Sequence, residues 1–480
     1  MSTPVALSRK LNLWATVSIV AGSVIGSSIF MKPAVMAGQL GSPLLLLFVW
    51  FFAGAISMMG AAINAEIGAM LPVTGGQYVF FQKMYGNFFA YIYGWACFSV
   101  INTASVAAIA YIFAQYAEYF YIFPRFAPSV EHYWQLTLPF IGQLYPLENF
   151  GVKSVTILVV CLLTWVNSLS VKGGGTVQVI FSAIKVVALI LMIGIIFFSG
   201  KGSTHHFIET SQHTGLKGWA VLGGIIAALS GAFAAYDGWN NIGFVAGEIN
   251  DPKKNIPRGL FIGLGICIVL YILTSEAYLY ILPIDKMASS ALVATDALQP
   301  ILGNTGVGFI ALLVMTSAFG ATNGNILACS RVTFAMATEG VFFKRIGKVH
   351  AIHKTPANAL WLHCIWTCLF VLTGSFDMLT DLFVFITWIF YGFAAAGIFI
   401  LRKKMPNAER PYKAWGYPVA PAIFVIFSAF YFVLTLYSDI NNYLTGKTHF
   451  INSVFGLALT IMGIPLYFYF KRKNKIIEHY

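Results

Sequence analysis

Two of the long apolar stretches in this sequence are interrupted near their middles. Residues 20–30 read VAGSVIGSSIF and residues 233–241 read FAAYDGWNN, so glycine, serine and aspartate stand where a membrane-spanning helix would be apolar. Lipid offers no partners to free N–H and C=O groups, so a spanning backbone opens only where it lines a cavity or is buried in protein. Paired interruptions in the two halves of a membrane protein are the best sequence indication of a transporter's binding site.

The composition is that of a membrane protein. Of the 480 residues, 58% are hydrophobic and 10% are charged, whereas soluble domains carry about 25% charged residues. Apolar stretches long enough to cross a hydrocarbon core of ~30 Å recur along the whole chain. We therefore predict an all-α membrane protein, a single transmembrane domain over residues 1–480. Its twelve spans are predicted at residues 13–38, 43–69, 87–121, 152–170, 175–199, 219–247, 259–283, 305–336, 357–374, 379–401, 418–438 and 452–470.

The formal net charge of +12 could indicate a nucleic-acid partner, but its distribution argues against one. Most lysines and arginines fall in segments that alternate to the same side as the N-terminus, such as Arg9-Lys10 and residues 402–404. This asymmetry follows the positive-inside rule. It predicts a multi-pass protein of the cell membrane with both termini in the cytoplasm, a lipid bilayer around it and no nucleic acid bound.

Ionisable residues within the spans are the next candidates, because each costs roughly 2.5–3.5 kcal/mol at membrane depth. Lys185 lies in the middle of the fifth span, where a coupling or conformational role is favoured over packing, since a buried ammonium could replace a bound cation. Asp237 lies in the interruption of the sixth span. Three roles are open for it: a carboxylate satisfied within the core, a helix cap, or a contact to substrate. Glu66 is expected to form a structural or gating salt bridge.

The first interruption also has two interpretations. Gly22 and Gly26 fit the small-xxx-small pattern of packed membrane helices. The continuation into Ser27-Ser28 favours a helix that stops and restarts. A restarting helix would offer free N–H groups and a positive dipole end to an anion.

Catalytic and metal-binding motifs are not evident. All six cysteines fall within predicted spans; Cys364 and Cys368 share a helix face, and apolar packing is the preferred explanation. The chain lacks a P-loop, a nucleophile elbow and an H-E-x-x-H motif. We therefore expect a protein that is not an enzyme, with no metal site and no cofactor.

Four segments, in order, resemble the L-amino-acid transporter family of the amino acid–polyamine–organocation superfamily, and the resemblance covers nearly the whole chain. The family's I-G-S-G-I-F signature is similar to residues 25–30, with Ser28 in place of a glycine, and its F-A-Y-x-G-W-N stretch to residues 234–240. Its acidic-N-P…I-P loop is similar to residues 247–258, and its R-P-[YI] loop to residues 401–412.

The resemblance implies a leucine-transporter-type fold with twelve helices, of which 1 and 6 are discontinuous. Residues 13–199 would form the first inverted repeat, residues 219–401 the second, and residues 418–470 two peripheral helices. It also implies alternating access to a site at the bilayer midplane, which agrees with the positions of the two interruptions.

The resemblance also assigns roles to individual residues. The substrate carboxylate would bind N–H groups of Gly26, Ser27 and Ser28, and its ammonium the carbonyls of Val24, Ala234 and Asp237. Phe385 and Trp388 would bound the side-chain pocket, Lys185 would substitute for a coupling sodium ion, and Tyr271 matches a tyrosine of the seventh span. The family's gating aromatic aligns with Ala234, so either the gate is missing or Phe233, one residue earlier, takes its place. Ile25 and Asn240, within the same two motifs, complete the candidate site.

The leading hypothesis is a sodium-independent exchanger of neutral L-amino acids, with Asp237 as a helix cap. The alternatives are a cationic amino acid exchanger with Asp237 as counter-ion, and a cation-coupled symporter. A channel or receptor is disfavoured because the sequence contains neither repeated filter sequences nor room for a sizeable soluble domain. The loop between spans 3 and 4 has no counterpart of the cysteine that links animal members to a heavy chain, so we expect a stand-alone protein.

Overall fold

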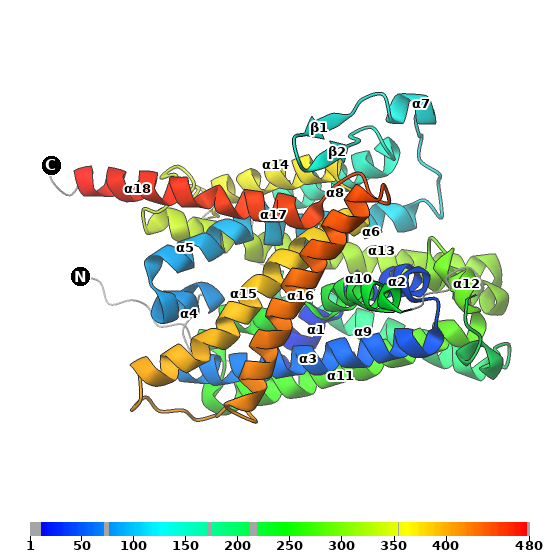
Figure 1. Ribbon diagram of the computed structural model, residues 1–480, viewed down its shortest axis with the longest axis horizontal. Helices are drawn as coiled ribbons and strands as arrows, with labels where there is room; N and C mark the ends of the chain where they lie inside the picture. Colours follow the sequence, from blue (N-terminus) through cyan, green and yellow to red (C-terminus); the bar gives the residue numbers. More distant parts are fainter. Residues whose placement is uncertain (1–10, 72–75, 170–173, 212–217, 354, 478–480) are drawn as a thin grey trace.

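The computed structural model describes residues 11–71, 76–169, 174–211, 218–353 and 355–477, and these are almost entirely helical (Figure 1). The α-helices are α1 (Leu13–Val24), α2 (Lys32–Leu40), α3 (Pro43–Met70), α4 (Gly76–Tyr85), α5 (Asn87–Ala96), α6 (Asn102–Ala117), α7 (Pro128–Glu131), α8 (Phe150–Leu169), α9 (Gly174–Phe198), α10 (Trp219–Tyr236), α11 (Pro252–Ile281), α12 (Ile284–Ala288), α13 (Val293–Thr338), α14 (Ala357–Thr373), α15 (Phe376–Lys404), α16 (Val419–Leu444), α17 (Asn452–Ile461) and α18 (Gly463–Ile477). Four short helical segments connect them: η1 (Ser27–Phe30), the π-helical η2 (Cys97–Ile101), η3 (Thr204–Phe207) and η4 (Trp239–Glu248).

Nine of the described helices are long and apolar enough to cross a membrane, and three further apolar helices are shorter. Each of the twelve predicted spans overlaps one of these helices. The chain is thus a multi-pass, all-helical membrane protein, as its composition predicts. The 46-residue helix α13 is two helices joined at Gly303, where φ is 63°, and the predicted eighth span begins just after this kink.

The helices differ in how deeply they are buried. Figure 1 shows α3 and α11 lying side by side, and α1 packs against α11 as well. In α15, 72% of the most apolar stretch is buried, whereas in α16, which crosses the front of this view, the value is 22%. Side chains of α15 therefore face other helices on most sides, while α16 leaves most of its surface to the surroundings.

The loop between α6 and α8 carries the only strands of the described residues, β1 (Leu136–Leu138) and β2 (Gly142–Leu144), which pair antiparallel. This small hairpin is fixed to the segment before α17. The N–H of Gln143 donates to the carbonyl of His449 at 2.8 Å, and that of Ile451 donates to Ile141 at 2.9 Å. Neither contact was predicted from the sequence.

The predicted salt bridge of Glu66 is present at one end of α3. Its carboxylate accepts two hydrogen bonds from the Arg402 guanidinium, at 2.9 and 2.7 Å, and one from the N–H of Ala414 at 2.6 Å. Arg410 lies 3.7 Å away. Glu66 is buried, and removing one partner from a buried ion pair typically costs about 3–5 kcal/mol. This pair therefore fixes α3 to the end of α15 and the loop that follows it.

Candidate functional site

The two predicted helix interruptions are present, and they meet each other. α1 ends at Val24, after which Ile25 (ψ 87°) and Gly26 leave the helical conformation. α10 ends at Tyr236, and Gly238 then takes a φ of +109°, a conformation open to glycine. A Cβ atom on Gly238 would lie 2.5 Å from the carbonyl oxygen of Ser23. Glycine is therefore required here both for its backbone angle and because the segments around Ser23 and Gly238 approach each other closely.

A cavity lies between these interruptions and brings together residues that the sequence separates by about 210 positions. The first interruption contributes Val24, Gly26 and Ser28, and the second contributes Ala234, Asp237 and Gly238. The remaining lining residues come from α1, α6, α13, α15 and the segment after Gly238: Ser23, Ser105, Ala108, Ile109, Asn325, Phe376, Thr380, Phe383 and Asn241. The cavity is thus lined by backbone groups and a few small polar side chains on one side and by partly apolar side chains on the other.

The backbone around Gly26 supplies hydrogen-bonding groups to this region. The N–H of Ile25 is the last to bond back into α1, reaching Ala21 at 2.7 Å. η1 then begins at Ser27, and the first N–H groups of any helix have no partner within it. The Ser27 hydroxyl is fully buried and has no hydrogen-bond partner among the described residues. The Ser27 hydroxyl and the first N–H groups of η1 are therefore hydrogen-bond donors next to the cavity, which Gly26 and Ser28 line and Ser27 does not.

Tyr271 of α11 joins the two interrupted helices. Its hydroxyl lies 2.8 Å from the carbonyl oxygen of Val24 and 3.1 Å from that of Ala235. Its ring packs edge-on against Trp50 and beside Tyr236, with centroids 5.6 and 5.2 Å away. The residue that the sequence nominated by resemblance alone thus contacts the ends of both α1 and α10.

Asp237 has a partner that the sequence argument missed. Its Oδ1 atom accepts a hydrogen bond of 2.6 Å from the hydroxyl of Tyr391 on α15, and the N–H of Gly238 is a second donor. Asp237 also borders a second cavity, beside Asn240 and Tyr391. Asn240 accepts a hydrogen bond from the side-chain amide of Asn64. No sequence signal pointed to Tyr391, which lies on another helix 154 residues further along the chain.

The aromatic residues predicted for the site pack against one another and against α16. Trp388 packs against Phe233, with ring centroids 3.8 Å apart, and stacks on Phe424 of α16. Phe385 stacks on Phe432, also of α16. Neither Phe385, Trp388 nor Phe233 lines the two cavities, whereas Ala234 lines the first.

Helix geometry explains why these aromatic residues do not line the cavities. Phe376, Thr380 and Phe383 are spaced by four and three residues, so they share the face of α15 that borders the cavity. Phe385 and Trp388 are three residues apart on the face that α16 covers. In this structure the apolar wall of the first cavity on the α15 side is therefore formed by Phe376 and Phe383.

Lys185 is buried on α9, with 3% of its surface exposed. It borders a small cavity with Phe30 of η1, Met192 of its own helix, and Ile310 and Ser317 of α13. Among the described residues, no hydrogen bond or ion pair involves its ammonium group. α9 packs against both α1 and α11, so this lysine lies close to the first interrupted helix.

A helical membrane protein whose two interrupted helices enclose a shared cavity has the architecture of a secondary transporter. The family model described as amino acid permease matches residues 11–463, and the chain belongs to this family. This confirms the resemblance to the amino acid–polyamine–organocation superfamily and to its L-amino-acid transporter family.

Individual relatives match almost the whole chain. The human large neutral amino acids transporter small subunit 2 is 31% identical over 99% of this chain and 83% of its own. The mouse Asc-type amino acid transporter 1 is 29% identical over 100% of this chain and 85% of its own. The serine/threonine exchanger SteT of Bacillus subtilis is 27% identical, covering 98% of each chain.

The contacts of Tyr271 generate a stability prediction with a matched control on the same helix. Tyr271→Phe should lower the free energy of unfolding by about 1–2 kcal/mol, because it removes a hydroxyl that bonds two backbone carbonyls. Tyr278 is equally buried, but its hydroxyl contacts only the weak acceptor Sδ of Met192, at 3.7 Å. Tyr278→Phe should cost less than about 0.5 kcal/mol. Denaturation of both variants in detergent is the measurement, and equal losses would contradict a bridging role for Tyr271.

Proposed function

We propose that this protein is a sodium-independent exchanger of neutral L-amino acids that works by alternating access. In this proposal it has twelve spans, with residues 13–199 and 219–401 as inverted repeats and residues 418–470 as peripheral helices. The observation that carries the proposal is the cavity between the two helix interruptions, because opened backbone faces it from both halves of the chain.

An α-amino acid presents a carboxylate and an ammonium group within a few ångströms of each other. The N–H groups at Gly26, Ser27 and Ser28 would bind the carboxylate, since the start of a helical segment favours anions. The carbonyls of Val24, Ala234 and Asp237 would bind the ammonium. An ideal Cβ on Gly26 would lie 3.7 Å from the Val24 oxygen and 4.0 Å from the Ser28 nitrogen, so space is open beside both groups.

A neutral substrate side chain suits the remaining walls. Ala108, Ile109 and Phe383 offer apolar surface, while Ser105 and Asn325 add small polar groups. The Asp237 carboxylate is already hydrogen-bonded to Tyr391, which reduces its demand for a cationic partner. The names of two relatives, one a transporter of large neutral amino acids and one a serine/threonine exchanger, support the same substrate class.

Lys185 would act as the fixed cation that makes sodium unnecessary. A buried ammonium at membrane depth is costly and is retained where it serves a function. Its cavity includes Phe30 of the first interrupted helix, so movement of that helix would change the surroundings of the charge.

The remaining features complete the proposal. The positive-inside distribution of charge favours cytoplasmic termini in a cell membrane. The name of the human relative describes a small subunit, but the segment between α6 and α8 of this chain contains no cysteine. The proposed exchanger therefore works without a disulfide-linked heavy chain.

The site itself is tested by Gly26→Val. Gly26 has extended backbone angles that valine also adopts, and its Cβ would meet no protein atom closer than 3.7 Å, so the variant should fold. Its methyl groups would instead occupy the space of the substrate, and uptake of radiolabelled amino acids into proteoliposomes should be abolished. Gly223→Val, in α10 with nothing near its Cβ, is the control that should transport normally. Uptake by Gly26→Val at the wild-type rate would remove the site from this cavity.

The coupling role is tested by Lys185→Ala and by the longer, uncharged Lys185→Met. Both should slow exchange severely, because the fixed charge is lost whether or not the volume is kept. Wild-type exchange should be unchanged when external sodium is replaced by choline at constant ionic strength. A steep rise of uptake with sodium would favour a symporter and overturn this role of Lys185.

The substrate class is tested by competition, because Asp237 lines the cavity and is the one feature that favours a cationic exchanger. Excess arginine should inhibit labelled leucine or alanine uptake weakly, since the Asp237 carboxylate is engaged by Tyr391. Strong inhibition by arginine that disappears in Asp237→Asn would establish the cationic alternative. Excess serine, which is neutral and small, is the positive control for inhibition.

A further inference from the structure

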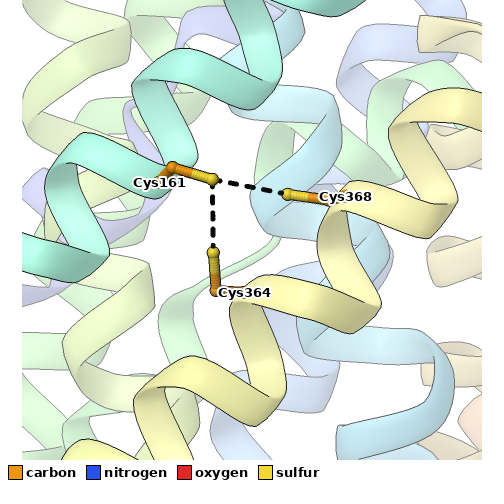
Figure 2. Close-up of side chains that lie close together, drawn as sticks. All are labelled: Cys161, Cys364 and Cys368. Atoms are coloured by element: carbon orange, nitrogen blue, oxygen red, sulfur yellow. Dashed lines mark hydrogen bonds between the residues drawn. The ribbon is translucent and has the colours of Figure 1, made fainter.

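Three cysteine side chains converge where α8 and α14 pack together (Figure 2). The Sγ atom of Cys161 lies 3.7 Å from that of Cys364 and 3.9 Å from that of Cys368, and all three sulfurs lie within 4.8 Å of one another. None of them is in a disulfide. The sequence relates Cys364 to Cys368 as neighbours on one helix face, but nothing in it joins them to Cys161, about 200 residues earlier.

The spacing of the sulfurs suits a shared metal ion. With a metal–sulfur bond of about 2.3 Å, sulfurs lie about 3.8 Å apart around a tetrahedral centre and about 4.0 Å apart around a trigonal one. The distances from Cys161 fall close to this range. Cys364 and Cys368 are held one helical turn apart, so two of the ligands are already positioned by α14 before any ion binds.

The ligand set selects the kind of ion. Three thiol groups form the only cluster of three or more histidine, cysteine or acidic side chains with metal-binding spacing in the described chain, and no histidine, aspartate or glutamate joins them. Structural zinc almost always takes four ligands. Sulfur ligands favour soft ions, Cu(I) among them.

We propose that Cys161, Cys364 and Cys368 form a three-coordinate binding site for Cu(I) that joins α8 to α14. Binding displaces a proton from each sulfur that becomes a thiolate, with no change in the oxidation state of the metal or of the cysteines. Cys161 and Cys368 are partly exposed, and their neighbours Leu162 and Ile365 are 45% and 59% exposed. The three sulfurs therefore lie close to the outer surface of the helix pair.

This site is separate from the proposed transport site. Neither α8 nor α14 contributes a residue to the two cavities beside the helix interruptions. Loss of Cu(I) binding and loss of amino acid transport can therefore be measured independently in the same variants.

The test is a competition between the full-length protein and a chromophoric Cu(I) chelator, bicinchoninate, in detergent, under reducing and oxygen-free conditions. The wild-type protein should withdraw one Cu(I) per chain. Cys161→Ala, Cys364→Ala and Cys368→Ala should each weaken the affinity by more than about 100-fold, since loss of even a second-shell partner commonly costs 10–100-fold. X-ray absorption of the loaded protein should show three sulfur ligands.

Cys329→Ala is the matched control, because Cys329 belongs to the same apolar cluster but not to the group of three sulfurs. It should bind Cu(I) like the wild type. Elution of each variant as a single species in detergent, with retained amino acid uptake, establishes that it is folded. Failure of the wild type to compete with the chelator, tighter binding of Zn²⁺ than of Cu(I), or equal binding by all four variants would overturn the proposal.

Discussion

The structure depends on one constraint, which is that polar backbone groups released inside a membrane must find partners within the protein. Two helices open in this chain, and each opening exposes N–H and C=O groups that lipid cannot satisfy. The protein resolves this by placing the openings against each other, so close that Gly238 lies on the carbonyl of Ser23. Tyr271 then bonds carbonyls on both sides. The cavity is the space that remains between them.

The same constraint explains why the sequence predicted the two helix interruptions. Glycine and serine in the middle of an apolar stretch are costly in a helix, so VAGSVIGSS and AAYDGWNN mark the openings without any structural information. The sequence pattern of α15 says less about which of its side chains face the cavity, because most of this helix is buried. Sequence alone could not determine which of Phe383, Phe385 and Trp388 faces the cavity, since this depends on how α16 covers the helix. The partners of Asp237 and Cys161 were hidden for a related reason, because both lie on other helices, more than 150 residues away.

Charged groups within the bundle fall into two kinds. Glu66 is surrounded by Arg402, Arg410 and a backbone N–H, so its charge is compensated and it fixes α3 to the segment after α15. Lys185 has only a small cavity and no charged partner among the described residues. A compensated pair adds little beyond fixing two elements, whereas an uncompensated ammonium makes the energy of the protein sensitive to every nearby dipole. This difference is the physical basis for the structural role of Glu66 and for the proposed coupling role of Lys185.

Under the proposed function, the bond between Tyr271 and Val24 would link substrate binding to the state of the helices. On the proposed binding mode, the ammonium of an amino acid approaches the same Val24 carbonyl that now accepts the tyrosine hydroxyl. A carbonyl oxygen has two lone pairs, so both donors can bind together only if their directions differ. Where the directions coincide, the stronger, charged donor displaces the hydroxyl, which keeps Ala235 as its acceptor. The bond between α1 and α11 would then be replaced by a bond between α1 and the substrate. The first interrupted helix would be loosened from α11 when the site is filled. A helix freed in this way is the kind of element whose movement alternating access requires.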